Sequence, residues 1–142
     1  MRRILLVEDN ADDIELTRSV LQEHRVDARI EVVEDGVEAL AYLSAAAVAG
    51  ELPELLIVDL NLPRMGGLEL LRQVRADSRF RHLPVVILTS SIADADVAAS
   101  YELGANSYVR KPVDYDEFVL AARKLGEYWL DINHPSSADT PR

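Results

Sequence analysis

Five polar residues with the chemistry of a phosphoryl-binding site lie far apart along the chain, each at the end of a short apolar run. They are Glu8 and Asp9 after 4–7, Asp59 after 55–58, Thr89 after 85–88, and Lys111 after 107–110. Carboxylates bind hard cations, an ammonium neutralises phosphoryl oxygens, and a hydroxyl donates a hydrogen bond to one of them. Carboxylates brought together repel, and at least one has a raised pKa unless a cation neutralises them.

The elements that must position these residues alternate between strand and helix. Apolar or β-branched runs at 4–7, 29–33, 55–58, 85–88 and 107–110 predict five short strands. Helical spacing follows each run, at 11–23, 36–43, 68–74, 94–103 and 116–129. This alternation indicates an α/β fold, in which helices cover both faces of a parallel sheet. Ligands bind beyond the carboxyl ends of such strands, so the five polar residues are expected at one edge of the sheet.

Local signals predict where several of these helices begin and end. Asn10 is expected to cap the first helix, with Asp13 three residues later near the positive end of the helix dipole. The second helix is expected to fray over 45–50, with Gly50 as its stop, and Gly104 is expected to stop the fourth. The chain is predicted to divide into one domain at 1–130 and an arm or tail at 131–142. The part of this tail that follows Asn133 is expected to be disordered.

Composition excludes several classes of function. The chain has 142 residues, of which 49% are hydrophobic, and a formal net charge of −10, as expected of a single globular domain. It has no cysteine for a disulfide or a thiolate site, no apolar run long enough to span a membrane, and no signal-peptide pattern. The acidic balance disfavours nucleic acid and anionic membranes as partners. A cytoplasmic protein is therefore expected.

The oxygen-rich character of the predicted edge indicates its cofactor. A few carboxylate ligands beside open solvent suit Mg²⁺, which keeps several of its waters. A carboxylate in such a site that attacks phosphorus forms an aspartyl phosphate.

Motifs at four of the five strand ends together resemble the receiver domain of two-component response regulators, over about residues 3 to 130. These motifs are Glu8-Asp9-Asn10, Asp59 with Leu62-Pro63 and Met65-Gly66-Gly67, Thr89-Ser90, and Lys111-Pro112. The resemblance implies a flavodoxin-like (βα)5 doubly wound sandwich with a parallel sheet in the order 2-1-3-4-5. It also implies a signalling phosphoacceptor that catalyses only its own phosphorylation and dephosphorylation.

The same resemblance assigns the chemistry of the site. Asp59 is expected to accept a phosphoryl group from a phosphohistidine of a sensor histidine kinase. Asp9, Asp59 and the backbone carbonyl of Asn61 are expected to hold Mg²⁺, with Glu8 acting through metal-bound water. Lys111 is expected to pair with Asp59 and then with the phosphoryl group.

Two further residues are implied to act as a switch. Thr89 is expected to move toward the phosphoryl group and Tyr108 to turn inward behind it, which alters the face formed by the fourth helix, fifth strand and fifth helix. The peptide bond between Lys111 and Pro112 is expected to be cis by the same resemblance.

The last helix ends in an aromatic and apolar cluster, Tyr128, Trp129 and Leu130. Such a cluster packs either onto its own domain or against a partner. Together with residues 100–101 and 111–114, it resembles the single-domain regulators that accompany phytochrome-type sensor kinases. That resemblance implies a homodimer formed through the last helix and the arm. No second core is evident, so no DNA-binding or messenger-producing output is expected.

Rival functions are disfavoured by particular residues. Phosphatases of the haloacid-dehalogenase type also use an Asp nucleophile, Mg²⁺ and a lysine, but they carry a second Asp where this chain has Asn61. A degenerate receiver that binds a partner without phosphorylation would not need the complete set of site residues. No glycine-rich nucleotide-binding motif follows the first strand.

Overall fold

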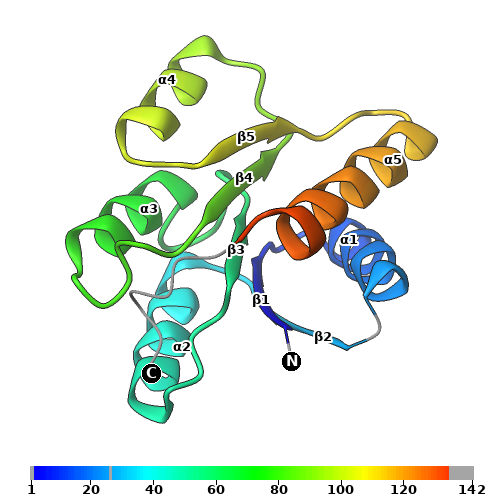
Figure 1. Cartoon of the computed structure of the whole chain (residues 1–142). Helices are drawn as coiled ribbons and strands as arrows, with labels where there is room; N and C mark the ends of the chain where they lie inside the picture. Colours follow the sequence, from blue (N-terminus) through cyan, green and yellow to red (C-terminus); the bar gives the residue numbers. More distant parts are fainter. Residues whose placement is uncertain (1, 26, 135–142) are drawn as a thin grey trace.

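Five parallel strands form one sheet in the order β2-β1-β3-β4-β5. The computed structural model describes residues 2–25 and 27–134. The strands are β1 (Arg2–Val7), β2 (Ala28–Val33), β3 (Leu55–Val58), β4 (Val85–Thr89) and β5 (Ser107–Arg110). Leu5 of β1 lies opposite Glu31 of β2 on one side and Leu56 of β3 on the other. The predicted flavodoxin-like fold and its strand order are therefore confirmed (Figure 1).

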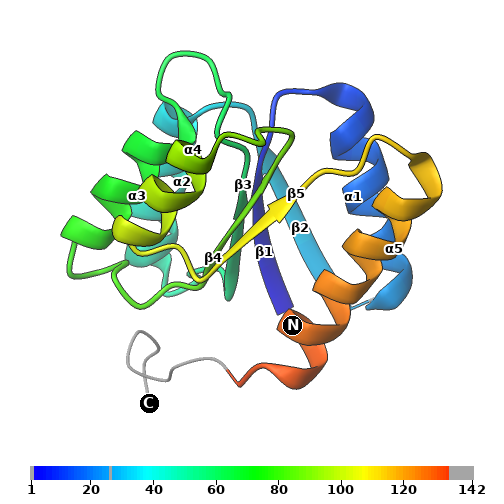
Figure 2. The same cartoon turned by 90° about the horizontal axis from the view of Figure 1, so that it is seen from above.

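Helices cover both faces of this sheet. They are α1 (Ala11–His24), α2 (Gly36–Ala49), α3 (Gly67–Ala76), α4 (Asp94–Glu102) and α5 (Tyr115–Gly126), and a π-helical segment, η1 (Glu127–Ile132), follows α5. Figure 2 shows α2, α3 and α4 on one side of the sheet and α1 and α5 on the other. No helix in the described ranges is long and apolar enough to cross a membrane.

Alternate side chains of the central strands build two cores. Leu5 and Leu56 pack with α2 and α3, whereas Ile4 and Ile57 pack with α1 and α5. Because β1, β3 and β4 are buried on both faces, their sequences read as continuous apolar runs. Polar side chains in these strands are therefore confined to the strand ends, which is where the site forms.

The predicted cap and stop residues of the first, second and fourth helices are confirmed, but one predicted frayed end is not. Asn10 Oδ1 accepts a hydrogen bond from the backbone N–H of Asp13 at 3.0 Å. Gly50 and Gly104 both have positive φ, of 71° and 100°, and each lies just after a helix. The predicted fraying over 45–50 is wrong, because α2 stays helical to Ala49. Alanines at 45–47 have the highest helix propensity of any residue type, and Ala46 is also buried.

The C-terminal segment turns back onto its own domain. The helix predicted to reach Trp129 ends at Gly126, and η1 then carries Leu130 into the core beneath α1 and α5. The Leu130 carbonyl accepts hydrogen bonds from Arg2 and from Arg25. At 1% exposure, the Leu130 side chain cannot contact a partner, so its assignment to a dimer interface is wrong. The predicted disorder of the tail falls on 135–142, outside the described residues.

The loop between β3 and α3 passes too close to the end of β3 for any side chain at position 67. A Cβ at Gly67 would overlap the Asp59 carbonyl oxygen and lie 2.8 Å from Leu60 Cα. A Cβ at the neighbouring Gly66 would lie 3.3 Å from the Leu60 carbonyl oxygen. Gly67 therefore allows the start of α3 to lie directly on the backbone of Asp59.

Replacing Gly67 with alanine is expected to lower the free energy of unfolding by about 1–3 kcal/mol, because the added methyl group displaces backbone. Urea denaturation monitored by circular dichroism measures this loss. Gly66→Ala is the matched control and is expected to cost less, since its Cβ has more room. Equal losses in the two variants would contradict the close approach at Gly67.

Candidate functional site

The carboxyl ends of β1, β3, β4 and β5 bring four predicted residues into direct contact. Lys111 Nζ lies 2.5 Å from Glu8 Oε1 and 2.7 Å from Asp59 Oδ2. Thr89 Oγ1 donates a hydrogen bond to Asp59 Oδ1 at 2.8 Å. All four side chains are buried or nearly so, and their contacts join residues up to 103 positions apart in the sequence. The structure thus assembles these residues into one site at a sheet edge.

Asp59 is held as an ionised carboxylate by three donors. Besides Lys111 and Thr89, the backbone N–H of Asn61 donates to Asp59 Oδ1 at 3.0 Å. Burial acts to raise the pKa of Asp59, but the hydrogen bonds from Lys111 and Asn61 outweigh it and lower the pKa below its usual value. An ionised, oriented carboxylate is the form that can attack phosphorus.

Glu8 is the site carboxylate whose ionised form is disfavoured. Its Oε2 accepts hydrogen bonds from the backbone N–H groups of Asp9 and Asn10, at 3.1 and 3.2 Å. Burial raises the pKa of Glu8 to about 7, and the nearby Asp59 charge adds to this, although Lys111 opposes both. Burial is thus the main cause of the raised pKa, and the neighbouring Asp59 charge is a smaller one.

Asp13 is a site residue that the sequence interpretation missed. Its Oδ2 lies 2.8 Å from Lys111 Nζ, so the ammonium contacts three carboxylates at once. Burial alone would lower the pKa of Lys111, but the hydrogen bonds that its ammonium donates to Asp13, Asp59 and Glu8 outweigh burial and raise the pKa. The signal was present in the sequence: a helix that begins at the site edge directs one face of its first turn toward the site.

The expected metal ligands lie at different depths. Asp9 and Asn61 are exposed at the rim, whereas Asp59 is buried below them. Across residues 2–25 and 27–134, no three acidic or histidine side chains converge as a metal site would require, and Lys111 contacts the carboxylates instead. The donors nevertheless fit a hard cation, because all are oxygens and three carboxylates share a single ammonium.

The peptide bond between Lys111 and Pro112 is trans, so the expected cis bond is wrong. No peptide bond is cis in the described part of the chain. The trans form is the ordinary preference of bonds to proline. From this trans bond, Lys111 still reaches all three carboxylates.

The two expected switch residues are connected through Ser91. The Tyr108 hydroxyl donates to the Ser91 carbonyl at 3.1 Å, so this half-buried side chain points inward toward the β4–α4 loop. Ser91 Oγ in turn donates to Asp96 Oδ2 at 2.5 Å, in the first turn of α4. Thr89 already contacts Asp59. The contact between Ser91 and Asp96 links this path to a helix and was not predicted from the sequence.

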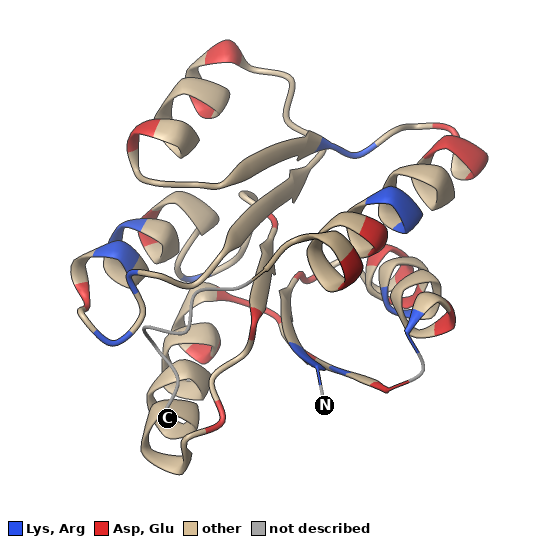
Figure 3. Ribbon diagram, in the orientation of Figure 1, with Lys and Arg blue, Asp and Glu red and all other residues tan. Residues whose placement is uncertain are grey.

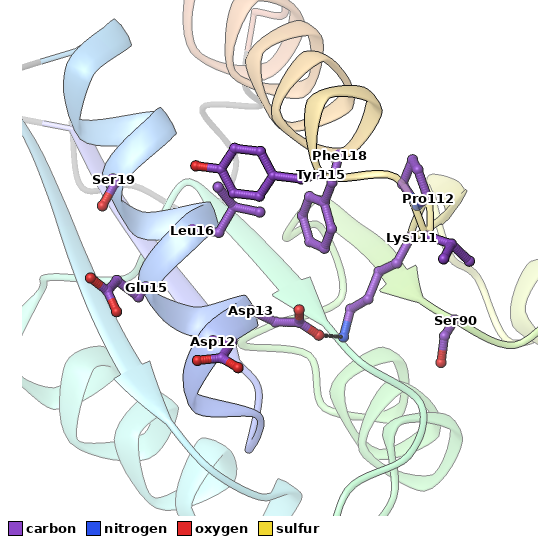
Figure 4. A pocket seen from close by; sticks show the side chains of 11 residues that line it. Asp12, Asp13, Glu15, Leu16, Ser19, Ser90, Lys111, Pro112, Tyr115 and Phe118 are labelled. Carbon is purple, nitrogen blue, oxygen red and sulfur yellow. Dashed lines mark hydrogen bonds and ion pairs between the residues drawn. The ribbon is translucent and has the colours of Figure 1, made fainter.

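A cavity of about 680 Å³ opens beside Lys111, between α1 and α5. Figure 4 shows Lys111 reaching toward Asp13, with Leu16, Tyr115 and Phe118 beside it. The cavity therefore joins the charged site to an apolar wall. Acidic residues elsewhere are spread over all five helices rather than gathered into one patch (Figure 3).

Comparison with known proteins relates this geometry to a family. Residues 4–123 match the family described as the response regulator receiver domain. The probable methanogenesis regulatory protein FilR2 of Methanothrix harundinacea is 37% identical over 131 residues, which cover 92% of this chain and 84% of FilR2. The response regulator Rcp1 of Synechocystis is 35% identical over 133 residues, which cover 90% of this chain and 88% of Rcp1.

Solved structures agree with this assignment. The phosphorylated cyanobacterial phytochrome response regulator RcpA has a TM-score of 0.91 at 34% identity, over 96% of this chain and 99% of RcpA. The Mn²⁺-bound form of Rcp1 has a TM-score of 0.90 at 32% identity, with the same coverage. The bacteriophytochrome response regulator RtBRR is 42% identical with a TM-score of 0.73, over 99% of this chain and 86% of RtBRR. The chain belongs to the response regulator receiver domain family, and regulators of phytochrome signalling are among its relatives.

Proposed function

We propose that this chain is a stand-alone response regulator that accepts a phosphoryl group on Asp59 from a phosphohistidine of a sensor kinase. The observation that carries the proposal is the ionised Asp59 carboxylate, held between Lys111 and Thr89 at the sheet edge. The similar phytochrome regulators RcpA and Rcp1, matched over nearly their whole length, support a single receiver domain in phosphorelay signal transduction.

The transfer follows from these contacts. An Asp59 oxygen attacks phosphorus in line with the leaving imidazole, the nitrogen–phosphorus bond breaks, and an acyl phosphate forms. Lys111 moves from the Asp59 carboxylate to the phosphoryl oxygens, and the Thr89 hydroxyl donates to one of them. The chain itself catalyses only this phosphorylation and the later hydrolysis of the acyl phosphate, in which water attacks phosphorus and releases inorganic phosphate and the free Asp59 carboxylate.

We propose Mg²⁺ as the cofactor, held by Asp9, Asp59 and the backbone carbonyl of Asn61, with Glu8 acting through metal-bound water. When bound, the cation neutralises negative charge on the transferring phosphoryl group. The oxygen-only donors and the three carboxylates that share one ammonium support this assignment. The Mn²⁺-bound form of Rcp1 shows a divalent cation in a relative.

We propose a phytochrome-type sensor histidine kinase as the partner, because phytochrome regulators recur among the relatives. The cavity between α1 and α5 offers such a kinase an apolar wall beside Lys111. The formal charge of −10 and the acidic residues on every helix disfavour nucleic acid and membranes as partners of this chain. We also propose a cytoplasmic location.

Phosphorylation is proposed to act on the surface formed by α4, β5 and α5. Thr89 and Tyr108 lie on adjacent strands, and both are hydrogen-bonded to Ser91. Ser91 in turn donates to Asp96 in the first turn of α4. A phosphoryl group that draws the Thr89 hydroxyl away from Asp59 changes one end of this path. The other end is the surface of α4, to which a partner protein can bind.

A homodimer through the C-terminal segment is also proposed, with a smaller interface than the sequence indicated. Tyr128 is 48% exposed and packs edge-on against the half-buried Trp129, with ring centroids 5.0 Å apart. Ile132 is 70% exposed on the same segment. Tyrosine and tryptophan are enriched among the residues that contribute most to binding at protein interfaces.

Acetyl phosphate or phosphoramidate with Mg²⁺ is expected to add one phosphoryl group to the wild-type chain, because Asp59 is ionised and oriented. Intact-mass spectrometry measures the adduct. Asp59→Asn is expected to abolish it, whereas the control Asp27→Asn, at an exposed residue beyond the far end of α1, retains it. A wild-type chain without a Mg²⁺-dependent adduct would overturn the proposed function.

Glu8 is expected to make the metal-free protein less stable as the pH rises from 5.5 to 8. Its pKa in the folded protein, about 7, exceeds its ordinary value, so its contribution is present at low pH and is lost through pH 7. The loss is on the order of 2 kcal/mol, measured by urea denaturation at several pH values. Glu8→Gln is expected to flatten the profile, and Mg²⁺ is expected to restore wild-type stability at pH 8. A Glu8→Gln profile with the wild-type slope would refute this role.

Light scattering at high micromolar concentration is expected to find a dimer, and Tyr128→Ser is expected to weaken it by about tenfold or more, as loss of an interface aromatic does. Val48→Ser is the control, because Val48 is 89% exposed on α2, away from η1. A wild-type monomer both with and without phosphorylation would rule out the proposed dimer.

A further inference from the structure

The loop after Asp59, residues 60–66, contains an unusual backbone conformation. Arg64 has a φ of 60°, and it is the one non-glycine residue with positive φ in the ranges that the structure describes. The left-handed region disfavours residues that carry a side chain, and such residues persist only where their surroundings hold them. The contacts of Arg64 therefore indicate what this loop is built to do.

Arg64 is held by a buried carboxylate on a neighbouring helix. Its Nε and Nη2 each lie 2.7 Å from Asp35 Oδ2, at the start of α2. Asp35 is only 5% exposed, and its Oδ1 caps α2 by accepting from the backbone N–H of Glu38 at 2.9 Å. The Glu38 N–H and then the Arg64 guanidinium hold the pKa of Asp35 below its usual range. The pair is therefore charged at neutral pH.

A backbone contact beside Arg64 joins the same two segments. The N–H of Gly36 donates to the Met65 carbonyl at 3.0 Å. A Cβ at Gly36 would lie 2.8 Å from the Met65 side chain, so α2 and the loop are in close contact. The loop is thus fixed to α2 at two consecutive residues, 64 and 65.

The other end of the loop enters the phosphoryl site. The Asn61 N–H donates to Asp59 Oδ1 at 3.0 Å, and the Gly67 N–H donates to the Leu60 carbonyl at 3.1 Å. Between these bonds and the contacts with α2, the backbone of 60–66 has little freedom. The position of residue 61 over Asp59 consequently depends on how the loop is anchored at residue 64.

We propose that Arg64 is a positioning residue for the site, acting through its ion pair with Asp35. The pair sets the loop backbone so that Asn61 presents its N–H to Asp59 and its carbonyl to a divalent cation. This inference deepens the proposed function and rests on it for the role of the cation. Glycine would supply a left-handed turn at position 64 without strain. Arginine adds charge-assisted contacts from Nε and Nη2 to one oxygen of a buried carboxylate, which glycine cannot supply.

Three substitutions separate the ion pair from the backbone conformation. Arg64→Gly removes the pair and also relieves the left-handed strain, whereas Arg64→Ala removes the pair and keeps the strain. Arg64→Lys keeps the positive charge but replaces the two guanidinium contacts with Asp35 by a single ammonium. The matched control is Arg72→Ala, which removes an exposed ion pair with Glu69 on α3, outside the loop.

Two measurements on the full chain test the proposal. The first is the amide shift of Asn61 in ¹H–¹⁵N spectra without metal, and the second is the dissociation constant of Mg²⁺ by titration. Arg64→Gly is expected to move the Asn61 amide and weaken Mg²⁺ binding by about tenfold, although relief of strain limits any loss of stability in urea. Arg64→Ala is expected to weaken binding similarly, and Arg64→Lys less. Arg72→Ala is expected to match the wild type.

The outcomes separate this inference from the proposed function. Wild-type Mg²⁺ affinity and an unmoved Asn61 amide in both Arg64→Gly and Arg64→Ala would overturn the role of Arg64, even if Asp59 is phosphorylated normally. A moved amide with weakened Mg²⁺ binding in a chain whose wild type cannot be phosphorylated would support the role of Arg64 and overturn the phosphoacceptor. A loss of Mg²⁺ binding that appears equally in Arg72→Ala would also overturn the role of Arg64, since the effect would not be specific to the loop.

Discussion

One ammonium group surrounded by carboxylates is the interaction on which the site depends. Lys111, at the end of β5, contacts Glu8 after β1, Asp13 on α1 and Asp59 after β3. Removing the ammonium would leave two buried carboxylates, Glu8 and Asp59, without their shared cation beside the partly exposed Asp13, which would raise the pKa of at least one of them. The same imbalance of charge explains why the site suits a cation. The contacts that hold the strand ends together therefore also prepare the site for metal and phosphoryl chemistry.

The sequence predicted the sheet and the strand-end residues because both follow from local pattern. Apolar runs can be buried on both faces, and parallel strands place the residues after them at one edge. The burial of Leu130 could not be predicted in this way. Residues 128–130 are all aromatic or apolar, so no pattern marks which of them faces the core, and it is the π-helical segment after Gly126 that turns Leu130 inward. The residue type at position 64 does not predict its left-handed backbone, because this conformation is set by the contact with Asp35, 29 residues earlier.

The residue two positions after Asp59 distinguishes this site from that of a phosphatase with the same nucleophile. A second acid at that position would protonate a leaving group. Here the Asn61 side chain is exposed, and its backbone N–H is bonded to Asp59. The position thus contributes through its backbone, which makes the loop that carries it part of the site.

The helix α5 joins the two ends of the molecule at which function is proposed. It begins at Tyr115, four residues after Lys111, and ends at Gly126, directly before η1. Its 12 residues span about 18 Å, at about 1.5 Å per residue. Salt screens exposed charges over about 8 Å at physiological ionic strength, so the electric field of a phosphoryl group is largely lost before the exposed Tyr128. A phosphorylation-dependent change in the proposed dimer would therefore require a conformational change in α5 and η1 rather than direct attraction or repulsion by the phosphoryl charge.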